Sequence, residues 1–117
     1  MSQTGSSPAN RFVELRDTEA LDHFLTQSNG SPVIIFKHSN MCGISARAHD
    51  QMALLEHPVG LVTVQQARPV SDEIETRTGV EHHTPQVFIL RGDKVLWTAS
   101  HGQIKAAAVE AALLANQ

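Results

Sequence analysis

The segment that decides the fold is Val33-Ile34-Ile35-Phe36-Lys37-His38-Ser39-Asn40-Met41-Cys42-Gly43-Ile44-Ser45. It opens on four apolar residues, which is typical of a buried parallel strand. A short polar loop follows, and after Cys42 the apolar positions take helical spacing. A cysteine at the start of a helix meets free N–H groups and the positive end of the helix dipole, which favour the thiolate. We therefore interpret Cys42, the only cysteine of the chain, as a reactive thiol rather than a small buried hydrophobe.

Outward from this segment, the sequence predicts alternating strands and helices. Strands are expected over 11–15, 33–36, 61–64, 87–90 and 94–97, with helices over 17–28, 42–56, 71–79 and 104–114. In the second helix, a buried face is expected to carry Ile44, Ala48, Met52 and Leu55. The early strand–helix–strand units require parallel pairing, whereas the last two strands, joined through Gly92, form a hairpin. The sheet should therefore be mixed.

Length and composition indicate one domain. Residues 1–10 are rich in Ser, Gly and Pro and are predicted to be a disordered tail, and 11–117 a single folded domain. A net charge of −3 with few aromatic residues argues against a nucleic-acid surface. The chain shows neither an apolar stretch of membrane-spanning length nor a signal peptide. A single cysteine fits a reducing compartment, so the cytoplasm is the expected location.

Several separate motifs carry a family resemblance. The element order resembles the thioredoxin fold, with Cys42-Gly43-Ile44-Ser45 after the second strand and Thr84-Pro85 before the fourth. Within that superfamily the chain resembles the YtxJ-type monothiol bacilliredoxins. The segments that carry this second resemblance are Phe36-Lys37-His38-Ser39, Gly79-Val80, Thr84-Pro85-Gln86 and Ala99-Ser100-His101.

The resemblance implies both a fold and an activity. The fold would be α/β and thioredoxin-like, a mixed central sheet of four to five strands flanked by about four helices. Ser45 stands where a dithiol protein keeps its resolving cysteine, so Cys42 would act alone as a thiol–disulfide oxidoreductase. It would take the small thiol from protein mixed disulfides, with bacillithiol or glutathione as co-substrate and no tightly bound cofactor. Its partners would be thiolated proteins and another redoxin or reductase.

Ser45 lies one helical turn after Cys42, and the i, i+3 spacing would let it donate its hydroxyl to the thiolate, although an ordinary exposed helical serine is an equal alternative. The resemblance implies further roles at the site. Gly43 and Ile44 would line the thiol-binding surface, and the Thr84–Pro85 bond would be cis and face Cys42.

Positive charge near the thiolate is a further expectation. Lys37, His38 and Arg47 could hold an anionic small thiol, but charges at a strand end are more often solvated, and we favour that interpretation for Lys37. The histidines His38, His82 and His83 are predicted on loops near Cys42, and His101 on another loop. Since none of them shows tight metal-ligand spacing, a metal site is not expected.

Two other functional classes remain open. One is an iron–sulfur or small-thiol-binding scaffold of the monothiol-glutaredoxin kind, although the Gly-Gly-Cys-Asp stretch of that family is replaced by residues 98–102. The other is a non-catalytic adaptor that binds partners through the Thr84–Pro85 face.

Overall fold

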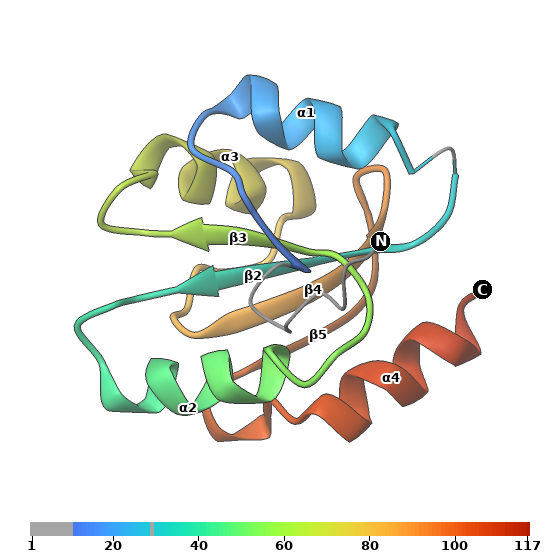
Figure 1. The fold of residues 1–117 in the computed structure, drawn as a ribbon. Helices are drawn as coiled ribbons and strands as arrows, with labels where there is room; N and C mark the ends of the chain where they lie inside the picture. The colour runs from blue at the N-terminus through green and yellow to red at the C-terminus, as the bar shows by residue number, and fades with distance from the viewer. Residues whose placement is uncertain (1–10, 29) are drawn as a thin grey trace, which may run out of the picture.

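One five-stranded mixed sheet forms the centre of the molecule (Figure 1). The structure, a computed structural model, describes residues 11–28 and 30–117, so the tail predicted over 1–10 lies outside the described residues. The strands are β1 (Phe12–Glu14), β2 (Val33–His38), β3 (Val59–Thr63), β4 (Gln86–Arg91) and β5 (Lys94–Ser100), in the order β1-β3-β2-β4-β5. β3 runs parallel to both β1 and β2, and β4 is antiparallel to both β2 and β5.

Helices cover both faces of this sheet. Figure 1 shows helices above the sheet and below it. The upper pair is α1 (Thr18–Thr26) and α3 (Arg68–Thr78); the lower pair is α2 (Gly43–Met52) and α4 (Ala106–Ala115), with the short 3-10 turn η2 (His101–Gln103) before α4. The predicted α/β class, with a mixed sheet of five strands and four α-helices, is confirmed. Within the described part of the chain, none of the helices has the length and apolar character needed to cross a bilayer.

The alternation of side chains along β2 divides the core in two. Ile34 and Phe36 pack with Met52 of α2 and with the buried face of α4. Ile35 points to the opposite face, where it packs with α1 and α3. The next residue on that same face is Lys37, which is therefore carried into the core beneath α3.

The second helix differs from the prediction at both its face and its end. It ends at Met52 rather than near position 56. Ile44, predicted to be buried, is 47% exposed, whereas Ser45 is fully buried together with Ala48. The buried stripe is therefore formed by Ser45, Ala48 and Met52, which are spaced three and four residues apart, and Ile44 lies outside it.

The third helix starts earlier than predicted. It begins at Arg68, with Pro69 in its first turn, a position that tolerates proline because the missing N–H has no intrahelical partner there. Ser71, predicted as the helix start, lies inside the helix and is buried.

Replacing Gly60 with alanine should destabilise the fold by about 1–3 kcal/mol. A Cβ at this position of β3 would lie 2.9 Å from side-chain carbons of Ile35, Leu15 and Phe24, all three in a close-packed core. Urea denaturation measures the change. Gly43→Ala is the matched control, because its Cβ meets nothing within 4 Å. Equal free energies of unfolding for Gly60→Ala and wild type would contradict this prediction, because the neighbouring side chains would then move aside without loss of stability.

Candidate active site

Cys42 lies immediately before α2, at the helix N-cap. Its backbone is extended (φ −130°, ψ 127°), its carbonyl accepts the Ala46 N–H at 3.0 Å, and its side chain makes no capping hydrogen bond. The residue is partly exposed. The sulfur is thus held at the start of the helix while remaining open to a reactant.

Ser45 has a different role from either of those expected. It is buried, and its hydroxyl oxygen accepts the Ser39 N–H at 2.9 Å and lies 2.8 Å from His38 Nδ1. Within the described residues these two groups, and not the Cys42 sulfur, are its hydrogen-bond partners. When Nδ1 carries a proton, Ser45 accepts twice and its own hydroxyl proton is free for another acceptor. When Nδ1 is unprotonated, the Ser45 hydroxyl donates its proton to a hydrogen bond with Nδ1.

Gln65, which follows β3, fixes the loop before Cys42. Its amide donates to the Ser39 hydroxyl at 2.8 Å, and its carbonyl accepts the Asn40 N–H at 3.2 Å. The Ser39 hydroxyl also accepts the Met41 N–H at 3.3 Å. No sequence signal points to Gln65, since the contact joins residues 25 or 26 positions apart.

A cavity of about 250 Å³ opens beside Cys42. Its wall includes His38, His49 and Asp50, and the latter two were missed by the sequence analysis. The His38 and His49 rings are 4.9 Å apart between centroids, and His49 also stacks on Phe12 at 4.5 Å. Burial lowers the pKa of His38 and the adjacent His49 lowers it further, despite the opposing effect of a hydrogen bond with the Ser45 backbone. His38 is therefore held mainly as a neutral imidazole near pH 7, able to accept a proton.

Lys37 is not brought to the thiol. Its side chain is fully buried on the face of the sheet that α3 covers, opposite to α2. The amine lies 5.9 Å from the Phe88 ring centroid and, within the described chain, has no hydrogen-bond partner. Burial lowers its pKa from 10.5 to about 8, against the pull of Glu75 and Asp72. Lys37 is therefore neither solvated nor placed beside Cys42, and both expectations from the sequence are corrected.

Thr84 and Pro85 lie at the same end of the sheet as Cys42. Gln86, the first residue of β4, pairs with Lys37 near the end of β2, which places Pro85 beside the loop that leads to the cysteine. The Thr84–Pro85 bond is cis, and the Pro85 carbonyl accepts the His101 N–H at 3.0 Å.

His82, His83 and His101 do not line the cavity beside Cys42. His82 faces α3: its Nδ1 lies 3.2 Å from the Ser71 hydroxyl, and its N–H donates to Glu75. His83 lies against His101, with 5.4 Å between the ring centroids. His38 is the last residue of β2 rather than part of a loop. Across residues 11–28 and 30–117, no group of three or more His, Cys, Asp or Glu side chains is arranged to hold a metal ion.

Comparison with known families decides the identity. The family model for the monothiol bacilliredoxin BrxC matches residues 13–109, which include Cys42, Ser45 and the Thr84–Pro85 bond. This chain belongs to the monothiol bacilliredoxin family. The resemblance found in its sequence is thereby confirmed, and the bacilliredoxin is a redox thiol protein.

Solved structures confirm the thioredoxin fold of this bacilliredoxin. A thioredoxin-fold protein shares 27% identity over 92% of this chain and 98% of its own, with a TM-score of 0.83. Thioredoxin from Fasciola hepatica matches with a TM-score of 0.72 at 12% identity, over 89% of this chain and 98% of its own. Mitochondrial thioredoxin 3 from Saccharomyces cerevisiae matches with a TM-score of 0.71 at 12% identity, over 94% of this chain and 99% of its own.

Replacing Ser45 with alanine should destabilise the bacilliredoxin by about 1–3 kcal/mol, because the Ser39 N–H and His38 Nδ1 lose a buried partner. Urea denaturation measures the effect. Ser31→Ala, at an exposed position, is the control and should change stability by less than about 0.5 kcal/mol. Equal losses in the two variants would show that Ser45 does not hold this loop.

Proposed function

We propose that this bacilliredoxin removes small-thiol caps from protein cysteines through exchange at Cys42, a de-bacillithiolation type of reaction. The observation that carries the proposal is that Ser45, rather than a second cysteine, stands one helical turn after Cys42. Cys42 presents a partly exposed sulfur at a helix start, while the position one turn later holds a buried serine already bonded to His38 and Ser39. With one cysteine in the chain, a mixed disulfide at Cys42 cannot be resolved by a second thiol of the same chain.

The exchange has two steps. In the first, the Cys42 thiolate attacks the cap sulfur, the protein–cap disulfide breaks, and the target cysteine leaves as a thiolate that takes a proton from solvent. Cys42 then carries the cap. In the second, the thiolate of another small thiol attacks the cap sulfur, which frees Cys42 and forms a small disulfide. That small thiol is the reductant, and a partner redoxin could take its place.

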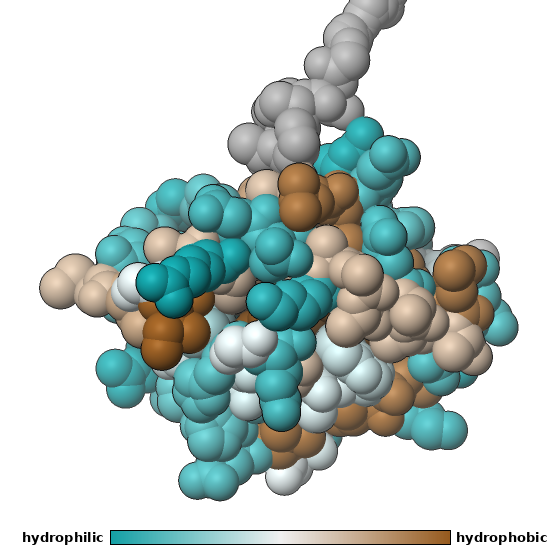
Figure 2. Space-filling view, turned by 90° about the horizontal axis from the view of Figure 1, so that it is seen from below, coloured by the Kyte–Doolittle hydropathy of each residue, from teal (hydrophilic) through white to brown (hydrophobic). Residues whose placement is uncertain are grey.

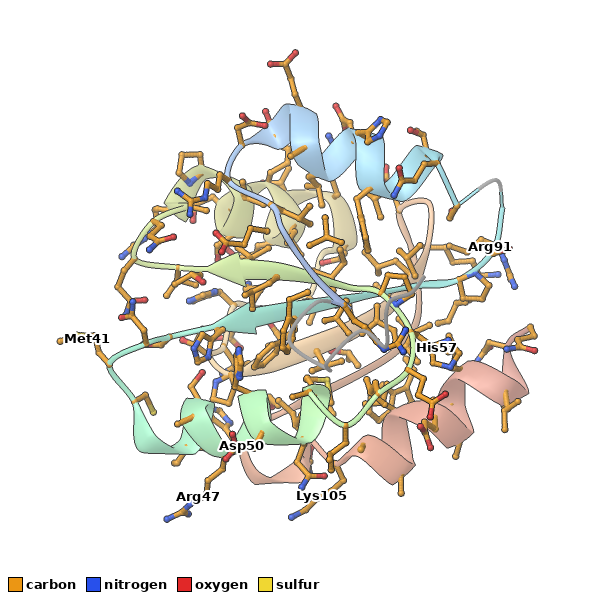
Figure 3. All side chains as sticks on the ribbon, viewed as in Figure 1. Met41, Arg47, Asp50, His57, Arg91 and Lys105 are labelled. Carbon is orange, nitrogen blue, oxygen red and sulfur yellow. The ribbon has the colours of Figure 1, made fainter. Side chains whose placement is uncertain are left out.

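The surroundings of the sulfur suit this chemistry. His38 and Cys42 line the same cavity, and Ser45 holds the His38 ring through Nδ1. Because burial lowers the pKa of His38, the ring is mainly neutral near pH 7 and keeps one unprotonated nitrogen. Met41 (82% exposed) and Ile44 flank the cysteine and offer apolar contact to a bound cap or target. In Figure 3, Met41 projects outward from the loop before α2. Gly43 adds no side chain that would restrict approach to the sulfur.

We assign the Thr84–Pro85 loop to the polypeptide of the thiolated partner, since this loop lies at the same end of the sheet as Cys42. We also place the reaction in the cytoplasm, because a lone thiol that must cycle as a thiolate requires a reducing compartment.

Intact-mass spectrometry tests the proposal. The reduced protein is mixed with a protein substrate capped by bacillithiol and, in parallel, with the same substrate capped by glutathione. The expected result is a gain of the mass of the cap on the bacilliredoxin and its loss from the substrate, faster for one of the two thiols. No transfer of either cap would overturn the exchange reaction.

A further inference from the structure

The buried amine of Lys37 has no part in the exchange reaction at Cys42. Lysine side chains normally keep their ammonium group in solvent, and Figure 2 shows hydrophilic residues spread over the surface on the side of α2 and α4. Lys37 is instead fully buried, and across residues 11–28 and 30–117 its amine is the one buried side-chain nitrogen or oxygen without a hydrogen-bond partner. Because such a group lowers stability, a functional role is the expected reason for its presence.

Two carboxylates of α3 act on this amine. Burial lowers the pKa of Lys37 to about 8, while the charges of Glu75 and Asp72 act in the opposite direction. His82 lies near the same amine: burial lowers the pKa of His82, and the charge of Lys37 lowers it further, as does that of Arg68. At pH 7 the Lys37 amine is therefore charged, and it attracts Glu75 from beneath α3.

Glu75 connects this charge to the loop that precedes β4. Its carboxylate accepts the His82 N–H at 3.0 Å. The next N–H of the loop, that of His83, donates to the Gln86 side chain at 3.3 Å. Gln86 is buried and pairs with Lys37 in the register of β2 and β4. Lys37 thus lies next to both of the side chains that fix the backbone of this loop.

We propose that Lys37 is a positioning residue for the partner polypeptide: through Glu75, it holds the loop that carries Thr84 and Pro85 in the conformation that binds a thiolated protein. This inference rests on the proposed function, which assigns that loop to the partner. A loop that is fixed before binding loses less conformational freedom when the partner binds, so the attraction raises the affinity for a capped protein. A small disulfide has no polypeptide to place on this loop, and Lys37 does not affect its reaction.

Two probes that transfer the same group test this role. One is a protein substrate capped by bacillithiol or glutathione, whichever Cys42 takes faster, and the other is the symmetric disulfide of that same thiol. In both reactions the Cys42 thiolate bonds to the same cap. The leaving thiolate is that of the target protein in the first reaction and that of the second small thiol in the other. Intact mass gives both rates, and their ratio cancels any change in the reactivity of Cys42.

Lys37→Met should lower the ratio of the protein rate to the small-disulfide rate about tenfold at pH 7, with the small-disulfide rate unchanged. Glu75→Gln keeps an oxygen that can accept the His82 N–H but removes the charge that Lys37 attracts, so it should have the same effect. In the double variant the two losses should not add, because each substitution breaks the same attraction. Above pH 8, where wild-type Lys37 loses its charge, the wild-type ratio should fall toward that of Lys37→Met.

Two matched variants control for net charge. Lys94→Met on β5 and Glu110→Gln on α4 each remove one exposed charge and should keep the wild-type ratio. An unchanged ratio in Lys37→Met, or losses that add in the double variant, would overturn the role of Lys37 and leave the exchange at Cys42 standing. Failure of both probes to cap Cys42 in the wild-type protein would overturn the proposed function itself.

Discussion

Replacing Cys42 with serine should abolish cap transfer and leave the protein as stable as wild type. Transfer is lost because the hydroxyl is a far weaker nucleophile than the thiolate and the chain has no second sulfur of this kind. Stability is kept because the cysteine side chain is partly exposed and makes no capping bond. Serine is a preferred N-cap residue, so the free energy of unfolding should be unchanged or rise by about 1 kcal/mol.

Two measurements on the same preparation test this prediction. Intact mass, with a capped protein substrate, should show no cap on the variant, and urea denaturation should show the unchanged fold. Residual transfer at the wild-type rate would place the reactive group elsewhere. The same variant separates the classes of function, since an adaptor would keep its partner without Cys42 whereas an exchanger would have no activity left.

Lys37→Met should raise the stability of the fold by about 3 kcal/mol at pH 7. The Lys37 amine is fully buried, and among the described residues no group accepts a hydrogen bond from it. Its pKa, lowered from 10.5 to about 8, corresponds to roughly 3 kcal/mol of unfavourable free energy for the charged form. Methionine has a similar length and flexibility and can pack against Phe88 without that cost.

The same substitution should remove a pH dependence. Below pH 8 the lysine is protonated in both the folded and the unfolded state, so the full cost is present. Between about 8 and 10.5 the folded state loses the proton while the unfolded state retains it, so wild-type stability should rise relative to that of the variant. The difference between the two proteins should therefore be largest at pH 7 and small at pH 10.5.

Urea denaturation of both proteins across this pH range measures the effect. Lys94→Met, at an exposed position on β5, is the control and should stay within about 0.5 kcal/mol of wild type. A Lys37→Met protein less stable than wild type at pH 7 would show that the buried amine is net favourable, with its attraction to Glu75 and Asp72 outweighing its burial.

The local pattern of residues by itself determined the architecture and the reactive group. Apolar runs such as 33–36 and 87–90, separated by helical spacing and turn residues, required alternating strands and helices. The order of these elements then fixed a mixed sheet, because parallel pairing needs a crossover and a hairpin gives antiparallel pairing. Cys42 followed from the same pattern, since a polar loop between a strand and a helix places its last residue at the helix start.

Only the tertiary structure decided what surrounds that sulfur. The burial of Lys37 depends on which face of β2 is covered by α3, and the burial of Ser45 on which side of α2 packs against the rest of the domain. Gln65 reaches Ser39 and Asn40 from 25 or 26 positions away in the chain. Periodicity along a chain reports which residues share a face. It does not report which faces meet, because that depends on packing between elements that share no local signal.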